Sequence, residues 1–152
     1  MFARIASFLT PVLLAGIAGV ASTPLTAESA TNGGGVALKA YFASDAGCFS
    51  TYSWAGIINN CSTARWISTT LPVPAGWHGT SVSIYGNGSM CHTISTNGVG
   101  NGANLGPDTW TLAGPKTWQT LYTGDRYVWD WSPVLFECLL ESGGIIGSFT
   151  AL

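Results

Sequence analysis

The residues best suited to ligand chemistry form a short aromatic run in the C-terminal part of the chain. Tyr127, Trp129 and Trp131 alternate along the sequence, and Asp130 lies between the two tryptophans. In a strand these three rings would point to one side, about 6–7 Å apart. Aromatic rings stack on the C–H faces of sugars, while carboxylates accept hydrogen bonds from sugar hydroxyls. The run therefore predicts a carbohydrate-binding site carried by Tyr127, Trp129, Asp130 and Trp131.

Two other interpretations of these rings stay open. Large aromatic side chains also fill β-sandwich cores, where they bury much apolar surface. In that arrangement Tyr127, Trp129 and Trp131 point inward, while Val128 and Asp130 face water. The rings could also form a surface for self-association. Further aromatic residues lie nearby in the sequence: Trp110, Trp118 and Tyr122.

The carboxylates offer a hydrolase alternative. Glycosidases hold two carboxyl groups roughly 5–9.5 Å apart. Glu137 and Glu141 would lie about 13 Å apart along one strand, and alternation predicts that both face solvent. Glu137 together with Asp130 fits the required spacing better. A small secreted hydrolase would therefore use Asp130 and Glu137.

The histidines and cysteines indicate no catalytic or metal site. His78 lies in a predicted turn, and His92 follows Cys91 on a predicted strand. The chain contains neither a Gly-x-Ser-x-Gly elbow nor a His-Glu-x-x-His motif. No cysteine has a second one at the Cys-x-x-Cys spacing of zinc sites. The sequence thus predicts no catalytic residue, no metal and no cofactor.

The four cysteines are better explained as two disulfides. An even number of cysteines is typical of proteins that fold in an oxidising compartment. Four cysteines allow three pairings. We favour Cys48–Cys61, which closes a local loop, and Cys91–Cys138, which joins strands far apart in sequence.

Short alternating segments separated by turn residues must position these groups. Runs rich in β-branched and aromatic residues recur about every ten residues, and no long window keeps a helical period. This pattern predicts an all-β fold, a single antiparallel β-sandwich of jelly-roll-like form. The expected strands are 36–42, 53–58, 65–71, 80–85, 90–96, 109–112, 117–123, 127–131, 134–141 and 145–150.

One long segment lacks this alternation. Residues 97–108 are rich in Asn and Gly and predict a mobile loop, of the kind that often carries function. A protease inhibitor would use this loop as its reactive segment. Tight inhibitors present preorganised loops, which argues against that role.

The first residues resemble a secretory signal peptide. A short basic start, Met1–Arg4, precedes the mostly apolar run Ile5–Ala21, and small residues allow cleavage after Ala21 or Ala27. We therefore expect a signal peptide over 1–27, a flexible lead-in over 28–35 and the β-sandwich domain over 36–152. The expected location is secreted or periplasmic, with no membrane span after cleavage.

The charge pattern excludes one class of partner. The whole chain has a formal net charge of −2 and only 8% charged residues. Nucleic-acid binding requires a basic surface that neutralises phosphates, which these few scattered cations cannot form. We therefore expect no nucleic-acid partner. The neutral polar surface suits a glycan, a cell-surface partner or self-association.

Several short motifs resemble a known group of proteins. They are the early Cys48, the Gly56–Asn60 turn, Leu71–Pro74, Ser81–Tyr85 running into Met90–Thr93, Leu135–Leu140 and Ile145–Phe149. Together they resemble a loose group of small exported bacterial proteins of unknown function. In that group a cysteine precedes the strand end that here reads Leu71-Pro72, whereas this chain has Cys61 in the Asn-Asn turn. The resemblance implies a secreted, disulfide-containing β-sandwich and no particular activity.

Taken together, these features favour a non-enzymatic extracellular binding or structural protein. A carbohydrate-binding module with an aromatic row is the sharper alternative. A small secreted hydrolase and a protease inhibitor remain as further alternatives.

Overall fold

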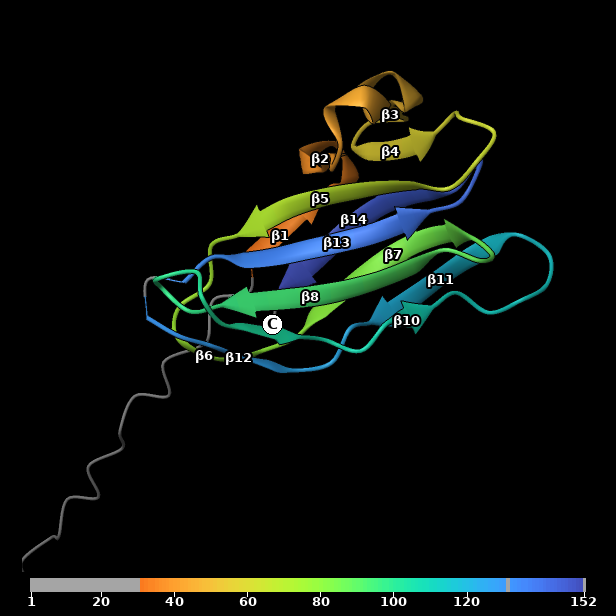
Figure 1. Cartoon of the computed structure of the whole chain (residues 1–152). Coiled ribbons are helices and arrows are strands. Elements are labelled where there is room, and N and C mark those ends of the chain that lie inside the picture. Colours follow the sequence, from red (N-terminus) through yellow and green to blue (C-terminus); the bar gives the residue numbers. More distant parts are fainter. Residues whose placement is uncertain (1–30, 131, 152) are drawn as a thin grey trace, which may run out of the picture.

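Two antiparallel β-sheets pack face to face in this chain (Figure 1). The computed structural model describes residues 31–130 and 132–151, so the predicted signal peptide and Trp131 lie outside the described residues. The first sheet has the order β11 (Thr117–Tyr122), β7 (Thr80–Gly86), β14 (Ile145–Ala151), β4 (Gly56–Asn59) and β3 (Phe49–Tyr52), and β1 (Thr31–Gly34) also pairs with β14. The second sheet has the order β10 (Thr109–Trp110), β8 (Met90–Thr96), β13 (Val134–Leu140), β5 (Arg65–Leu71) and β2 (Lys39–Ala40), and β9 (Ala103–Leu105) also pairs with β8.

Smaller elements complete the fold. A separate two-stranded sheet joins β6 (Gly76–His78) to β12 (Arg126–Val128). Two 3-10 segments, η1 (Gly35–Ala37) and η2 (Ala43–Cys48), lie near β2 and β3 in the sequence. The all-β fold and the antiparallel β-sandwich expected from the sequence are thus confirmed. No helix within the described ranges is long and apolar enough to cross a membrane.

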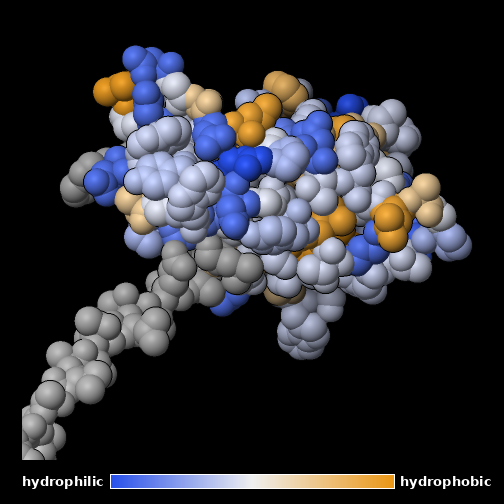
Figure 2. Space-filling model, turned by 90° about the horizontal axis from the view of Figure 1, so that it is seen from below, coloured by the Kyte–Doolittle hydropathy of each residue, from blue (hydrophilic) through white to orange (hydrophobic). Residues whose placement is uncertain are grey.

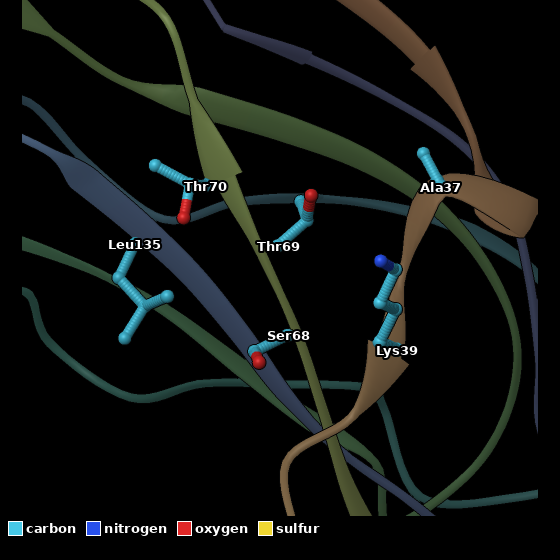
Figure 3. A pocket seen from close by; sticks show the side chains of 6 residues that line it. All are labelled: Ala37, Lys39, Ser68, Thr69, Thr70 and Leu135. Atoms are coloured by element: carbon cyan, nitrogen blue, oxygen red, sulfur yellow. The ribbon is translucent and has the colours of Figure 1, made fainter. Parts of the chain in front are cut away.

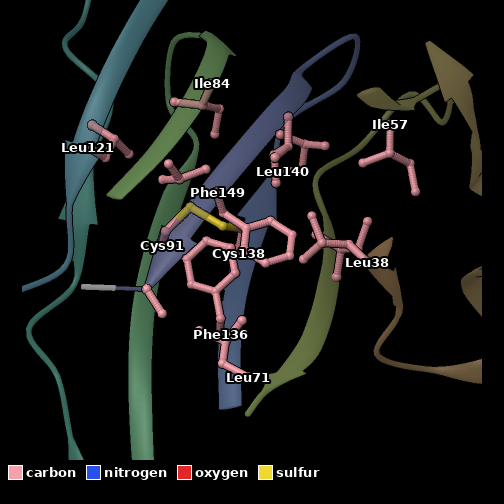
Figure 4. Close-up of a cluster of buried hydrophobic side chains, with 14 of the residues drawn as sticks. Leu38, Ile57, Leu71, Ile84, Cys91, Leu121, Phe136, Cys138, Leu140 and Phe149 are labelled. Atoms are coloured by element: carbon pink, nitrogen blue, oxygen red, sulfur yellow. A yellow bond between two sulfur atoms is a disulfide. The ribbon is translucent and has the colours of Figure 1, made fainter. Parts of the chain in front are cut away.

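The core lies between the two sheets, as the alternation of the strands requires. Val82 and Ile84 of β7 are fully buried, while the alternate residues Ser81, Ser83 and Tyr85 are half-buried on the outer face. From β13, Phe136, Cys138 and Leu140 enter the same core (Figure 4). Burying a side chain of this size contributes roughly 1.5–3 kcal/mol each. The period-2 pattern therefore decides which face of each strand is inside.

Both predicted disulfides are confirmed. Cys91 and Cys138 are directly opposite each other on β8 and β13, with Cα atoms 4.1 Å apart and an S–S bond of 2.05 Å. Figure 4 shows this disulfide among the buried side chains of the core. Cys48 and Cys61 are joined across η2 and the turn after β4, with Cα atoms 5.0 Å apart.

The strand boundaries predicted from the sequence agree best with the structure where the alternation is long and uninterrupted. The expected strands over 65–71 and 90–96 match β5 and β8 residue for residue. The expected strand over 36–42 is wrong, because only Lys39–Ala40 forms a strand and η1 forms a tight turn in which the Leu38 amide donates to the Gly35 carbonyl at 3.0 Å. The strand β3 was not expected from the sequence.

The 97–108 segment also differs from the expected mobile loop. Asn97 closes it, because its side-chain oxygen accepts hydrogen bonds from the amides of Asn101 and Gly102 at 3.0 and 3.2 Å. Its backbone amide bonds the Gly102 carbonyl at 2.9 Å, and β9 then returns along β8. The segment is therefore a closed hairpin rather than a long free loop.

The flexible lead-in expected over 28–35 is wrong for its described part, residues 31–35. Residues Thr31–Gly34 form β1, paired with β14, and Gly35 is buried. A Cβ atom on Gly33 would lie 2.3 Å from the Phe149 ring, and one on Gly35 would lie 2.1 Å from the Ile146 carbonyl oxygen. The glycines thus allow close packing of the backbone on the sheet.

We expect Gly35→Ala to lower the free energy of unfolding by about 1–3 kcal/mol, because the new methyl group overlaps backbone that cannot rotate away. Denaturant unfolding of the oxidised protein measures this change. Gly47→Ala is the matched control, since a Cβ there meets no atom within 4 Å. Equal midpoints for the two variants would contradict the packing argument.

Candidate functional site

Three exposed aromatic side chains meet on the small β6–β12 sheet. Trp77 and Tyr127 are paired across the two strands, and their ring centroids are 5.8 Å apart. The Tyr127 ring also contacts that of Trp129, at a centroid distance of 5.9 Å. Trp77 is 64% exposed, Tyr127 39% and Trp129 38%. We call these three residues the aromatic array.

The exposure of these rings decides between the interpretations that the sequence left open. Val128 is 1% exposed, so it is the residue of β12 that enters the core, while Tyr127 and Trp129 point outward. The core interpretation is therefore wrong for these two rings. Asp130 is exposed beside them, and Trp131 lies outside the described residues.

The geometry of the array differs from the flat row that alternation suggested. Adjacent rings are nearly perpendicular, with interplanar angles of 73° for Trp77–Tyr127 and 80° for Tyr127–Trp129. Such edge-to-face contacts are favourable because the positive ring edge meets the negative ring face. The strand also ends at Val128, so Trp129 follows β12 rather than continuing it. The array is a faceted surface, not a plane.

Sequence reasoning missed Trp77, the most exposed ring of the array. It lies 50 positions before Tyr127 and within a segment expected to be a turn. Only the pairing of β6 with β12 brings the two together. The Gly-Trp-His run that contains Trp77 has no sequence pattern that would have identified Trp77 as part of a binding site.

The array is anchored to the second sheet through the backbone of β12. The Ser95 hydroxyl donates a hydrogen bond of 2.6 Å to the Tyr127 carbonyl, and Val128 packs into the core. Figure 1 places β6 and β12 along the lower edge of the sandwich. Seen from below, the surface is mostly pale or blue, with small separate orange patches (Figure 2). The array is thus held from behind through the backbone and the buried Val128 of β12.

Buried threonines hold the segments that lead into the array. Thr93 and Thr123 share a hydroxyl hydrogen bond of 2.6 Å, and Thr93 also donates to the Thr80 hydroxyl at 3.3 Å. The Thr123 amide bonds the Thr80 carbonyl at 2.9 Å. All three are essentially buried. Since unsatisfied buried hydroxyls are unfavourable, this cluster fixes how β7, β8 and the approach to β12 meet.

Tyr122 supports the same region from the outside. Its ring covers Gly79, where an added Cβ would lie 2.4 Å from the Tyr122 hydroxyl oxygen. Gly79 links β6 to β7, so the ring covers the point where the chain leaves the array. The Tyr122 hydroxyl donates a hydrogen bond to the Asp125 carboxylate, at the turn before β12.

The hydrogen bond to Asp125, followed by burial and the negative charge of Asp125, raises the pKa of Tyr122 above its ordinary value of 10.0. All three effects favour the neutral phenol of Tyr122 in the folded state. Their contribution to stability is therefore complete below pH 10 and is lost as the pH rises through the raised pKa.

We expect Asp125→Asn to lower the pKa of Tyr122, because the substitution removes the negative charge beside the phenol. Ultraviolet absorbance titration measures tyrosinate formation, and Tyr122→Phe identifies the step that belongs to Tyr122. An unchanged titration in Asp125→Asn would contradict this assignment.

A second polar cluster lies on the outer face of the second sheet. His92 of β8 is opposite Glu137 of β13, and its Nε2 lies 3.0 Å from Glu137 Oε2. Its Nδ1 lies 3.0 Å from Asp108 Oδ1. Carboxylates only accept hydrogen bonds, so both contacts form together when the ring carries both protons. The Trp66 ring covers His92 at a centroid distance of 5.6 Å.

This cluster corrects two expectations about Glu137. Glu137 is 6% exposed, not solvent-facing, and it is bonded to His92. Glu137 is buried against His92 while Asp130 is exposed after β12, so Glu137 cannot serve with Asp130 as an accessible catalytic pair. The free oxygen of Glu137, Oε1, is buried and has no hydrogen-bond partner among the described residues. Glu137 is therefore not accessible to a substrate as a glycosidase acid.

A shallow hollow of about 400 Å³ lies beside this cluster, lined by Ala37, Lys39, Ser68, Thr69, Thr70 and Leu135 (Figure 3). Ser68 is the cross-strand neighbour of both Lys39 and Glu137. The hollow offers hydroxyls and one ammonium group but no aromatic ring. Across the part of the chain that the structure describes, no group of three or more His, Cys, Asp or Glu is arranged to hold a metal ion.

Comparison with known proteins gives likeness in fold at low identity. No protein-family model matches this chain, and no curated protein matches it at a significant level. One similar structure is the carbohydrate-binding module TmCBM61 in complex with β-1,4-galactotriose, at 13% identity, 81% coverage of this chain, 87% of that chain and a TM-score of 0.46. Another is the C-terminal carbohydrate-binding module of family 6 from LamC, a marine laminarinase of Zobellia galactanivorans, at 12% identity, 81% and 98% coverage and a TM-score of 0.48.

These likenesses do not bear on individual residues. They assign no role to the aromatic array or to the His92 cluster. The resemblance to small exported bacterial proteins is not tested by them and stays a prediction.

Proposed function

We propose that this chain is a secreted, non-enzymatic protein that binds carbohydrate through the aromatic array. The observation that carries this proposal is the exposure of three rings that contact one another and are anchored from behind. Two disulfides support folding in an oxidising, extracellular compartment.

Exposed rings in this arrangement are suited to sugar binding. Large apolar groups gathered on a surface mark interaction sites more often than isolated ones do. Here the edge-to-face contacts and the Ser95–Tyr127 hydrogen bond hold the rings before a ligand arrives. Little side-chain entropy is then lost on binding, which favours affinity. The exposed Asp130 beside the array supplies a hydrogen-bond acceptor for sugar hydroxyls.

The angles between the rings indicate what form the sugar takes. A flat crystalline polysaccharide surface would require rings that lie in one plane. The array has interplanar angles of 73° and 80°, so successive rings present faces in different directions. Such a surface fits a single bent or twisted oligosaccharide chain, whose consecutive residues also turn relative to one another. We therefore propose soluble glycan chains, not crystalline polymer, as the ligand.

We expect Trp77→Ala and Trp129→Ala each to weaken glycan binding about tenfold, a loss of about 1.4 kcal/mol. The physical reason is the loss of a stacking face of the array. A glycan array screened with the oxidised protein identifies the ligand, and calorimetry with the best soluble oligosaccharide measures the change.

Trp54→Ala is the matched control. Trp54 is 98% exposed on the turn between β3 and β4 and belongs neither to the aromatic array nor to the His92 cluster. Its loss should therefore leave both the fold and glycan binding unchanged. A wild-type protein that binds no glycan, and whose size on a gel-filtration column rises with concentration, would contradict the proposal. That result would favour a self-associating structural protein.

A further inference from the structure

We propose a second carbohydrate-binding site on the outer face of the second sheet, formed by Asp108 and Trp110 and oriented by His92 and Glu137. The inference rests on the proposed function for its ligand class. The second site uses different strands and different side chains from the aromatic array, so the two sites can be tested separately.

The Asp108 carboxylate is held in one orientation and still faces solvent. One of its oxygens, Oδ1, is bonded to His92 Nδ1 at 3.0 Å, while the side chain is 50% exposed. His92 has a side-chain exposure of only 10%, and Glu137 holds its other nitrogen at 3.0 Å. A chain of two hydrogen bonds thus connects an exposed carboxylate to a buried one. The second oxygen of Asp108 makes no hydrogen bond to any described residue and is available to a ligand.

Trp110 lies on the same face as Asp108. Trp110 is paired with Met90, and Thr109 with Cys91, so the side chain of Trp110 is on the outer side of the sheet with Met90. The Asp108 carboxylate is bonded to His92, which shares the outer face of β8 with Met90 two residues away, at about 6–7 Å. The Trp110 ring is 53% exposed. A stacking ring and an oriented acceptor are therefore neighbours.

Backbone hydrogen bonds fix the segment at both ends. On one side the Gly106 amide donates to the Thr93 carbonyl at 2.8 Å, and a Cβ on Gly106 would lie 2.7 Å from that oxygen. On the other side the Thr111 amide donates to the Ser89 carbonyl at 2.9 Å, and the Ser89 amide donates to the Thr111 hydroxyl at 3.0 Å. Preorganisation of this kind lowers the entropic cost of binding.

The charges of the cluster select the class of sugar. A carboxylate accepts hydrogen bonds and donates none, so the ligand must donate. Asp108 presents a carboxylate to the ligand, and a second carboxylate, Glu137, lies behind it on the other side of His92. A carboxylate or sulfate of a sugar placed against the Asp108 carboxylate would be repelled. The site therefore fits adjacent hydroxyls of a neutral sugar, with the sugar's C–H face on Trp110.

The experiment is a calorimetric titration of the oxidised protein with neutral trisaccharides, namely galactotriose, cellotriose, laminaritriose and chitotriose, and with trigalacturonate as the acidic probe. We expect two binding sites per chain for a neutral trisaccharide. Trp77→Ala with Trp129→Ala should leave one site. Asp108→Asn and Trp110→Ala should each weaken that remaining site about tenfold or more, because one removes a charge-assisted acceptor and the other the stacking face.

Neither substitution should disturb folding, because the side-chain oxygen of the asparagine in Asp108→Asn can still accept the hydrogen bond from His92 and because Trp110 is exposed. Near-ultraviolet circular dichroism of each variant checks this expectation, and Trp54→Ala is the control. A single site that is lost only in the Trp77 and Trp129 variants would overturn this inference and leave the proposed function intact. Binding that depends on Asp108 and Trp110 alone would support it and remove the array from the proposed function. Preference for trigalacturonate at this site would overturn it, and no binding to any probe would overturn both proposals.

Discussion

Pairing of β8 with β13 is the constraint on which the rest of the structure depends. Cys91 and Cys138 lie directly opposite each other in the core, and their disulfide locks the two strands in one register. Because side chains alternate between the faces of a sheet, a slip of one residue would exchange the two faces of a strand. A slip of β13 would bring Glu137 into the apolar core and expose Phe136. The covalent bond and the hydrophobic pattern therefore enforce the same register.

Both candidate sites are attached to β8. On its inner face, Ser95 bonds the Tyr127 carbonyl of β12 and Thr93 bonds Thr123, which together hold β12 and the segment that leads into it. On its outer face, His92 holds Asp108, and at its start Met90 pairs with Trp110. A strand in the centre of a sheet, locked to its neighbour, is a rigid support. This explains how a chain with few charges can present fixed aromatic and polar groups at its surface.

The sequence was most informative where the signal is local. Uninterrupted alternation located β5 and β8 residue for residue, and the even set of cysteines indicated two disulfides, whose favoured pairing the structure confirmed. Alternation also placed Tyr127 and Trp129 on one face, but it left open whether that face was core or surface, and it suggested a flat row. Ring orientation depends on torsions that contacts decide, so the perpendicular arrangement could not follow from spacing.

By itself, the sequence determined the all-β class, the main strands and the presence of two disulfides, because period-2 alternation and an even cysteine count are properties of short segments or of composition; it favoured one of three disulfide pairings, which the structure then confirmed. Only the tertiary structure decided which residues meet. It placed Trp77 against Tyr127 through the β6–β12 pairing, His92 between Asp108 and Glu137, and the glycines of β1 and η1 tightly against β14. Each of these contacts joins residues far apart along the chain. They depend on strand register and on which face is buried, and a local pattern records neither.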